Sequence, residues 1–394
     1  MTILELVSII IPVYNNERFL KESFESVINL NYKNTEIIVI DDGSTDSSIK
    51  IIKEYQEKDN RILFFQNNSN IGTAKTIKKG ISKSKGRFIF FNAADDVSLE
   101  DRVERCLDIF TNNRNVGLIA STANIIDDNG LETGEMFNIN NQIQNHNIAI
   151  EQFKRNYCLG ATMAIVSDKD ILLKEGMLEY IDDYEISLEY LLNNYDIYLT
   201  REPLVKYRIH DFNQSNNRKD LSNKTKLIIK KYKYEDIFNN LKTRGYNEKE
   251  IYITLGIFSL FVDDLNDSIV YLERSEELTK EIYNKKLEFE KNFYLGVANY
   301  RIGNYKESMH RTRLAYEIDN KNPAVLNNLS VLKFRTSNGK TKDIEMLNLA
   351  LNRYPEYIDA KVNLEAMVSG VVKNTKITER ILDIQLYKRN QYEV

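Results

Sequence analysis

The sequence predicts an α/β domain followed by an all-α domain of helical repeats. Over the first hundred residues, patterns typical of buried strands alternate with helices, and acidic residues follow the ends of those strands. The last third of the chain is largely helical, with a recurring spacing of small residues. Because 394 residues exceed what one hydrophobic core usually serves, we expect a first domain over 1–215, a helical linker over 216–245 and repeats over 246–394.

Short apolar runs rich in β-branched residues predict strands that are buried on both faces of a parallel sheet. These runs are Val7–Ile11, Glu36–Ile40, Arg61–Gln66 and Arg87–Phe91. Helices are expected between them, from about Glu17, from the N-cap Asp46 to about Lys58, and from Gly72 to Lys83. The alternation favours right-handed crossovers and makes 1–100 the nucleotide-binding half of the domain.

The second half of this domain, 101–215, has a less regular pattern. Irregular strands are expected over 116–139, and helical segments over 148–194 alternate with a turn at Gly160–Met163. We expect this half to hold the second substrate.

Small residues recur at one spacing in the helical remainder. Leu255-Gly256 is followed nineteen residues later by Ser275, and Leu295-Gly296 is followed nineteen residues later by Ala315. Ala350-Leu351 with Pro355 continues the pattern. These helix–turn–helix copies resemble tetratricopeptide repeats, which stack to form a concave surface. An ordinary helical bundle is the alternative.

Composition excludes several classes of protein. The net charge is -4, and 54 basic and 58 acidic residues are interspersed without a basic stripe, so nucleic acid is not an expected partner. Cys106 and Cys158 show no pairing pattern, and the N-terminus lacks the features of a secretory signal, so we expect a reducing cytoplasm. No apolar run approaches the ~20 residues of a spanning helix, so any membrane contact should be peripheral.

Four motifs in the first domain point to one family. They are VSIIIPVYN at Val7–Asn15, IVIDDGSTD at Ile38–Asp46, Asn70-x-Gly72, and Asp95-Asp96. Together, over roughly 6–215, they resemble the family 2 glycosyltransferases of the Rossmann-like GT-A fold. The resemblance implies a nucleotide-sugar donor, with UDP as its nucleotide, over the carboxyl edge of the sheet. It also implies one divalent metal on the diphosphate and transfer with inversion at the anomeric carbon.

The resemblance implies a set of donor-binding residues. Asp41 can accept a hydrogen bond from the imide N–H of the base, although a plain turn with a helix cap is the alternative. Lys78 stands where the family usually has Ala-Arg-Asn, and Arg208 either approaches the diphosphate or pairs with a carboxylate such as Asp211. The full set is Pro12, Val13, Tyr14, Asn15, Glu17, Asp41, Asp42, Ser44, Asn70, Gly72, Lys78, Ala94, Asp95 and Arg208.

The same resemblance implies a site for Mn²⁺ or Mg²⁺, which take hard oxygen ligands. Asp95 is the expected ligand, and His210, in the segment Pro203–His210, is expected to complete the metal shell. The family usually carries Asp-x-Asp, but Ala93 replaces the first carboxylate here. The alternative is that Asp95-Asp96 only cap the helix that starts near Leu99.

Asp183 is the candidate general base, because an inverting displacement needs one carboxylate to take the proton of the acceptor. Glu185 is its rival, and both could simply complement the dipole of the helix that follows. The acceptor side is expected to include Gly160, Ala161, Thr162 and Asp182.

Two classes of function stay open at this point. The first is an active transferase that glycosylates a peptide or protein held partly by the repeats, or a surface polysaccharide with the repeats used for homodimerisation. The second is a scaffold protein with a degraded catalytic domain, for which the missing first aspartate is the argument. We favour the enzyme, because Asp41, Asp95, Asp183 and His210 are all retained.

Overall fold

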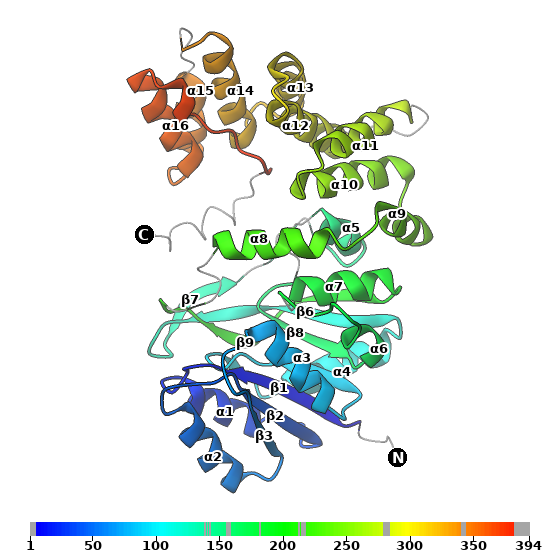
Figure 1. Ribbon diagram of the computed structural model, residues 1–394, viewed down its shortest axis with the longest axis vertical. Helices are drawn as coiled ribbons and strands as arrows, with labels where there is room; N and C mark the ends of the chain where they lie inside the picture. The colour runs from blue at the N-terminus through cyan, green and yellow to red at the C-terminus, as the bar shows by residue number, and fades with distance from the viewer. Residues whose placement is uncertain are drawn as a thin grey trace. The chain divides into compact units, whose positions relative to one another are not determined.

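The computed structural model describes residues 5–137, 139, 141, 143–154, 159–180, 183–211, 213, 218–278, 284–339 and 344–381. The chain divides into two compact units, Met1–Tyr232 and Lys233–Val394. The first unit is mixed α/β and the second is helical (Figure 1). The finer division into 1–215, 216–245 and 246–394 stays a prediction.

The first unit contains one mixed β-sheet, which has nine strands in the described residues. Its strand order is β3-β2-β1-β4-β8-β6-β9-β5, and β7 pairs with β6. The first four strands in this order are parallel, whereas β8 runs antiparallel to both β4 and β6. The strands are β1 (Val7–Val13), β2 (Thr35–Asp41), β3 (Ile62–Gln66), β4 (Phe88–Phe91), β5 (Val97–Ser98), β6 (Val116–Ile126), β7 (Glu132–Phe137), β8 (Thr162–Val166) and β9 (Asp196–Arg208).

The central strands are buried on both faces, because alternate residues point to opposite sides of the sheet. In β1, Ile9 and Ile11 pack in the core with residues of α1, α2 and α4. Ile10 faces α3, where a Cβ on Gly80 would lie 2.7 Å from the Ile10 Cγ2 atom. The helices of this unit are α1 (Leu20–Ile28), α2 (Ser48–Lys58), α3 (Thr73–Lys83), α4 (Arg102–Asn112), α5 (Ile148–Phe153), α6 (Lys169–Leu172), α7 (Asp183–Leu192) and α8 (Arg218–Ile229).

The predicted parallel strands and the helices between them are confirmed, with α1 beginning at Leu20 rather than near Glu17 and with Ser47 rather than Asp46 as the N-cap of α2. The turn expected at Gly160–Met163 is shorter than predicted, because Thr162 and Met163 already pair with neighbouring strands as the start of β8. The irregular second half therefore extends the same sheet with β6, β8 and β9 and forms no separate layer.

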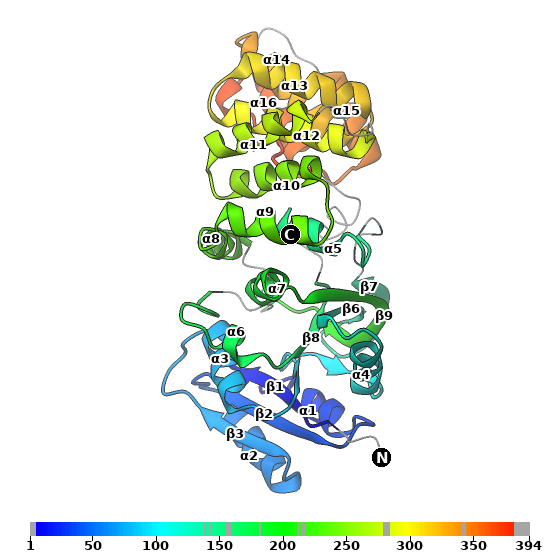
Figure 2. The same ribbon diagram turned by 90° about the vertical axis from the view of Figure 1, so that its right-hand side faces the viewer.

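The second unit consists of helices, and most consecutive helices pack as pairs (Figure 2). Ser268 Oγ donates to the Gly256 carbonyl at 2.7 Å, and Ser308 Oγ donates to the Gly296 carbonyl at 2.7 Å, so one contact recurs in two pairs. That the pairs are tetratricopeptide repeats stays a prediction. The elements are α9 (Tyr234–Thr243), α10 (Glu248–Phe261), α11 (Leu265–Glu277), α12 (Lys285–Arg301), α13 (Tyr305–Ile318), α14 (Pro323–Thr336), α15 (Ile344–Arg353), α16 (Ile358–Ser369) and the short η2 (Val372–Asn374).

In the described part of the chain, none of the helices combines the length and the apolar character that crossing a bilayer requires.

Candidate active site

Asp41 ends β2 with one carboxylate oxygen engaged and the other without a partner. Its Oδ2 atom accepts hydrogen bonds from the Gly43 and Ser44 N–H groups, both at 3.1 Å. Its Oδ1 atom is buried and has no hydrogen-bond partner among the described residues. Gly43 has a φ of 77°, and a Cβ there would lie 2.8 Å from the Ser69 carbonyl carbon, so the turn requires glycine. The fold thus keeps one acceptor atom ready at the strand end.

The loop after β1 is joined to the loop after β2 by reciprocal hydrogen bonds. The Asn15 N–H donates to Ser44 Oγ at 3.0 Å, and the Thr45 N–H donates back to Asn15 Oδ1 at 2.8 Å. The Glu17 N–H donates to Asp46 Oδ2 at 3.0 Å. Partial burial alone would raise the pKa of Asp46, but hydrogen bonds from Ser48 and Glu17 outweigh it and lower the pKa. The two strand-end loops form one connected wall.

Pro12 and Val13 are the last residues of β1, and Tyr14 leads out of the strand beside Asp41. Val13 pairs with Asp41 across the two parallel strands, and the Val13 carbonyl accepts the Asp42 N–H at 2.7 Å. Pro12 is half-buried, whereas the Tyr14 side chain is 44% exposed. An exposed aromatic ring next to this strand end is available to a ligand.

Asp42 and Asn70 shape the loop that precedes α3. Asp42 is buried, and its carboxylate accepts the Asn67 side-chain amide and the Ile71 and Gly72 N–H groups, all at 2.9 Å. Asn70 Oδ1 also accepts the Gly72 N–H, at 3.1 Å. The described contacts of Asp42 are therefore internal, and they fix the loop at the edge of the site.

The Lys78 side chain contacts the segment that follows α6. Its Nζ atom donates to the Met177 carbonyl at 2.9 Å and to the Lys174 carbonyl at 3.3 Å. The neighbouring Lys79, which the motifs do not mark, donates instead to Asn67 Oδ1 at 2.7 Å. Between the two lysines, Lys79 is the one bonded to the loop after β3.

Asp95 and His210 meet although 115 residues separate them in the sequence. Asp95 Oδ2 lies 2.9 Å from His210 Nε2, and the two side chains are 19% and 6% exposed. The imidazole packs on the Phe19 ring, with ring centroids 4.8 Å apart. The His210 N–H donates to Asn213 Oδ1 at 2.6 Å, which fixes the backbone at the end of β9. The structure therefore brings the two predicted metal ligands together.

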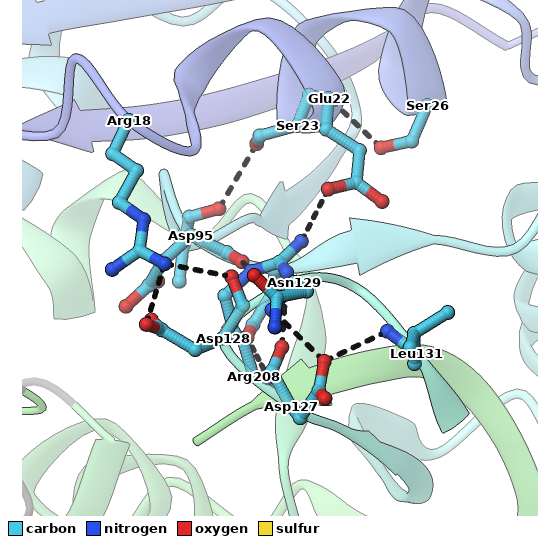
Figure 3. A network of polar contacts seen from close by, with 12 residues as sticks. Arg18, Glu22, Ser23, Ser26, Asp95, Asp127, Asp128, Asn129, Leu131 and Arg208 are labelled. Carbon is cyan, nitrogen blue, oxygen red and sulfur yellow. Dashed lines mark hydrogen bonds and ion pairs between the residues drawn. The ribbon is translucent and has the colours of Figure 1, made fainter. Parts of the chain in front are cut away.

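Arg208 is buried and connects three parts of the first unit (Figure 3). Its Nε donates to the Asp95 carbonyl at 2.8 Å, and its Nη1 donates to the Asp127 carbonyl at 3.1 Å. Its Nη2 forms an ion pair with Glu22 of α1, and not with Asp211 as one alternative had it. This guanidinium therefore joins the turn that carries Asp95 to the turn after β6 and to α1.

Two buried ionisable side chains, Asp96 and Arg102, hold the turn that carries Asp95 in place. Asp96 Oδ1 accepts the Arg208 N–H at 3.0 Å. Burial, and then the charge of Asp95, raises the pKa of Asp96 well above its ordinary value. Arg102 donates to Asn92 Oδ1 at 3.1 Å and to the Phe91 carbonyl at 2.7 Å, and burial lowers its pKa to about 10. The buried Ala94 completes this turn.

The motifs miss Arg102, but a sequence signal exists for it. Arg102 precedes Cys106 and Phe110 at intervals of four residues, which places it on the buried face of α4. A charged residue in an otherwise apolar helix stripe should have buried polar partners.

The small-residue segment of the predicted acceptor side packs directly on β6. Gly160 has a φ of 64°, and a Cβ there would lie 1.9 Å from the Ser121 carbonyl oxygen, so no other residue fits. The Ala161 N–H donates to the same carbonyl at 2.9 Å. Thr162 Oγ1 accepts from Arg102 at 2.6 Å, which connects this segment to the turn that carries Asp95. Asp182 lies outside the described residues.

The two candidate bases differ in their surroundings. Asp183 begins α7, is half-buried, and accepts the Tyr184 N–H at 2.6 Å through Oδ1. Glu185 is fully buried, lies 2.6 Å from Lys231 Nζ and accepts the Leu178 N–H at 2.9 Å. Burial raises the pKa of Glu185 despite the lysine. Glu185 is thus a buried structural partner of Lys231, and Asp183 is the more accessible carboxylate.

Asp95, which follows β4, and His210, which follows β9, are the side chains that would hold one divalent cation. Among the described residues, no group of three or more His, Cys, Asp or Glu side chains could hold a metal. Asp95 and His210 offer one carboxylate and one imidazole, a combination that suits Mn²⁺. A metal that also binds a diphosphate and water needs only one or two protein ligands.

The chain matches the model of glycosyl transferase family 2 over residues 8–181. It is 30% identical over 276 residues to an uncharacterized glycosyltransferase of Methanocaldococcus jannaschii, covering 68% of this chain and 88% of that relative. The chain belongs to glycosyltransferase family 2. This family 2 enzyme is therefore a glycosyltransferase that uses a nucleotide-sugar donor.

Two solved glycosyltransferases are among the structures that match this family 2 enzyme. Staphylococcus aureus TarS 1–349, in complex with UDP-GlcNAc, gives a TM-score of 0.48 at 13% identity, covering 98% of this chain and 91% of TarS. The mannosyltransferase PcManGT from Pyrobaculum calidifontis, in complex with GDP-Man and Mn²⁺, gives a TM-score of 0.46 at 12% identity, covering 70% and 76%.

Proposed function

We propose that this enzyme transfers a sugar from a UDP-sugar, with inversion and with a divalent metal, to a peptide or protein acceptor. The observation that carries the donor side is the buried Oδ1 atom of Asp41, which has no partner in the described residues. A buried carboxylate oxygen without a partner is costly, and a ligand N–H removes that cost. The imide N–H of uracil is the complementary donor, and cytosine lacks it.

The walls around Asp41 suit the rest of a nucleoside. The exposed Tyr14 ring can cover the base, and the Ser44 turn lies where the ribose would follow. Asp95 and His210 would hold Mn²⁺ or Mg²⁺, which supplies positive charge to the diphosphate leaving group. Arg208, bonded to the Asp95 carbonyl, keeps this ligand in place.

Asp183 is the proposed general base. As the acceptor hydroxyl or thiol attacks, its proton passes to the Asp183 carboxylate, and a bond forms from the acceptor oxygen or sulfur to the anomeric carbon. The bond from that carbon to the diphosphate oxygen breaks on the opposite face, and UDP leaves with the electron pair. One carboxylate suffices for this displacement, and the accessibility of Asp183 favours it over Glu185.

The helical unit supports the peptide acceptor. Helix pairs of the kind seen from α10 to α15, which we take to be tetratricopeptide-like repeats, present surfaces that bind extended peptides.

The test compares Asp183→Asn with Glu185→Gln. We expect Asp183→Asn to lower kcat on the order of 100- to 10,000-fold, the range for loss of a general base, with the Kd for UDP unchanged. Glu185→Gln should keep kcat within about tenfold and lower the melting temperature instead, because Glu185 has structural partners. A larger loss of kcat in Glu185→Gln than in Asp183→Asn would reverse the assignment.

The acceptor is tested by mass spectrometry of peptides encoded beside this gene, incubated with the enzyme, UDP-sugars and Mn²⁺. A mass increase of one sugar on a peptide is the expected result. Transfer to glycans with none to peptides would contradict the peptide acceptor and leave the donor chemistry standing.

A further inference from the structure

A stretch of the chain that follows α16 and η2 lies across the helices of the second unit (Figure 1). From Thr375 to Arg380 it forms neither helix nor strand, yet Thr375, Ile377 and Thr378 are each 4% exposed. Such a segment needs partners for its backbone groups, because no regular structure supplies them.

Two asparagines supply these partners in the same manner. Asn363 of α16 donates its side-chain N–H to the Lys376 carbonyl at 2.7 Å, and its Oδ1 accepts the Lys376 N–H at 2.7 Å. Asn328 of α14 donates to the Thr378 carbonyl at 2.8 Å and accepts the Thr378 N–H at 2.7 Å. Each amide thus binds both backbone groups of one residue. Lys376 and Thr378 are two residues apart, which is the spacing at which an extended chain presents its backbone groups to the same side.

The segment continues across further helices. Arg335 of α14 donates to the Thr375 carbonyl at 2.7 Å. Arg301 at the end of α12 lies 3.8 Å from Glu379, and the Arg380 guanidinium lies 5.6 Å from the centre of the Phe261 ring of α10. The chain therefore passes from α16 and α14 to α12 and α10 in an order opposite to the sequence.

A third asparagine, on α12, has an unused acceptor. Asn292 is 4% exposed, and its Nδ2 donates to the Glu288 carbonyl within its own helix at 2.8 Å. Its Oδ1 is buried and has no hydrogen-bond partner among the described residues. Asn292, Asn328 and Asn363 lie on α12, α14 and α16, one helix pair apart in the chain. A buried amide oxygen without a partner indicates a missing donor.

We propose that Asn292, Asn328 and Asn363 form a binding site for an extended peptide, recognised through its backbone, and that Thr375–Glu379 is the resident ligand of this site. An amide that donates to the C=O and accepts from the N–H of one residue matches a peptide group. Lys376 and Glu379 are exposed, and their ion pairs with Asp359 at 3.5 Å and Arg301 at 3.8 Å lie at the surface, where such pairs contribute little. These two side chains should therefore add little sequence preference. The identification of this peptide with the sugar acceptor rests on the proposed function; the binding itself does not.

The probe is a fluorescein-labelled synthetic peptide with the sequence of residues 371–381, VVKNTKITERI. The protein is the full chain, either unchanged or carrying Lys376→Pro and Thr378→Pro, which remove both N–H donors of the resident segment. We expect the proline variant to bind the probe at least tenfold more tightly, because its own segment no longer competes. Adding Asn328→Leu and Asn363→Leu should abolish this gain. A folded proline variant that binds no probe would overturn the proposal.

Two matched probes separate backbone from side-chain recognition. A peptide N-methylated at the positions of Lys376 and Thr378 should bind the proline variant at least tenfold more weakly. In a second peptide, VVKNTEITKRI, the residues at the positions of Lys376 and Glu379 are exchanged. It should bind the proline variant with an affinity within about threefold of that of the original peptide. Equal binding of the methylated peptide would contradict recognition through the backbone.

Asn292→Ala in the proline variant provides an independent test, because Asn292 makes no described contact with the resident segment. It should weaken probe binding at least threefold with the melting temperature unchanged, and unaltered affinity would remove Asn292 from the site.

If the proline variant loses its helical circular-dichroism signal, it does not fold, and the unchanged chain is used for the test instead. Millimolar free peptide should then accelerate hydrogen exchange at the Lys376 and Thr378 amides by displacing them, and unaltered exchange would overturn the proposal. No donor sugar is present in these assays, so their failure leaves the glycosyl transfer untouched.

Discussion

At the scale of single residues, the site depends on carboxylates whose two oxygens have different tasks. Asp41 uses Oδ2 to fix its own turn, and its Oδ1 has no hydrogen-bond partner in the part of the chain that the structure describes. Asp95 offers its side chain to His210 while its carbonyl holds Arg208. Asp42 has the opposite character, because both of its oxygens accept from the loop before α3. Of the two neighbouring aspartates at this strand end, Asp42 supports the loop, and Asp41 is the one we propose to bind the ligand.

The substitution Asp41→Asn tests this division. The asparagine oxygen can still accept from the Gly43 and Ser44 N–H groups, so the turn should fold. The amide nitrogen would then replace the free acceptor and face the imide N–H of uracil, donor against donor. Loss of a hydrogen bond to a charged group costs about 1.5–3 kcal/mol, so the Kd for UDP in calorimetry should rise about 10- to 100-fold.

The control for Asp41→Asn is Asp42→Asn. This variant should lower the melting temperature, because Asp42 bonds the loop before α3, while the folded protein should bind UDP with a nearly unchanged Kd. Unchanged UDP affinity in Asp41→Asn would contradict the contact with the base.

At the scale of elements, Arg208 shows how distant segments assemble the site. It ends β9, and its guanidinium bonds the turn after β4, the turn after β6 and, through Glu22, helix α1. The planar guanidinium presents several donors in fixed directions, which a lysine cannot reproduce. The position of Asp95 therefore depends on contacts with the turn after β6 and with helix α1 as well as on its own turn.

Arg208→Ala should lower the free energy of unfolding by about 3 kcal/mol, because the Asp95 and Asp127 carbonyls lose their donor inside the protein. Arg208→Lys should recover little of this loss. Glu22→Gln should cost about 1 kcal/mol or less, since Glu22 is half exposed. Urea unfolding measures all three, and a Glu22→Gln loss as large as that of Arg208→Ala would contradict the part given to the carbonyls.

The elements also show what the sequence can predict. The parallel strands follow from β-branched runs such as Val7–Ile11, because a strand buried on both faces must be apolar throughout. The carboxylates after them follow from the same pattern. The partners of Arg208 do not, since Glu22 lies 186 residues away and no local periodicity reports such a contact. The contacts of Lys78 with the segment after α6 are likewise tertiary, as is the pairing that makes Thr162 a strand residue.

At the scale of the whole molecule, the two units have separate cores and separate proposed ligands. Apolar side chains of the sheet and its helices are buried in the first unit, and Ile253, Phe293 and Phe334 are among those buried in the second. The donor site is built from the first unit alone, and the asparagine site from the second alone. Ligands of the two sites should therefore stabilise different parts of the chain.

Scanning calorimetry of the full chain tests this expectation. UDP with Mn²⁺ at about 100 times its Kd should add about 2.7 kcal/mol to the stability of the unit Met1–Tyr232 and raise the temperature of one unfolding step. EDTA, or Asp95→Asn, should remove most of this shift, because Asp95 is a proposed ligand of the metal, which would supply positive charge to the diphosphate. Lys376→Pro with Thr378→Pro should lower the temperature of the other step, since it releases the segment held by Asn328 and Asn363. One step that moves as a whole under both treatments would show that the two units unfold as a single cooperative body, and the ligands would then have to be assigned to their sites by hydrogen exchange.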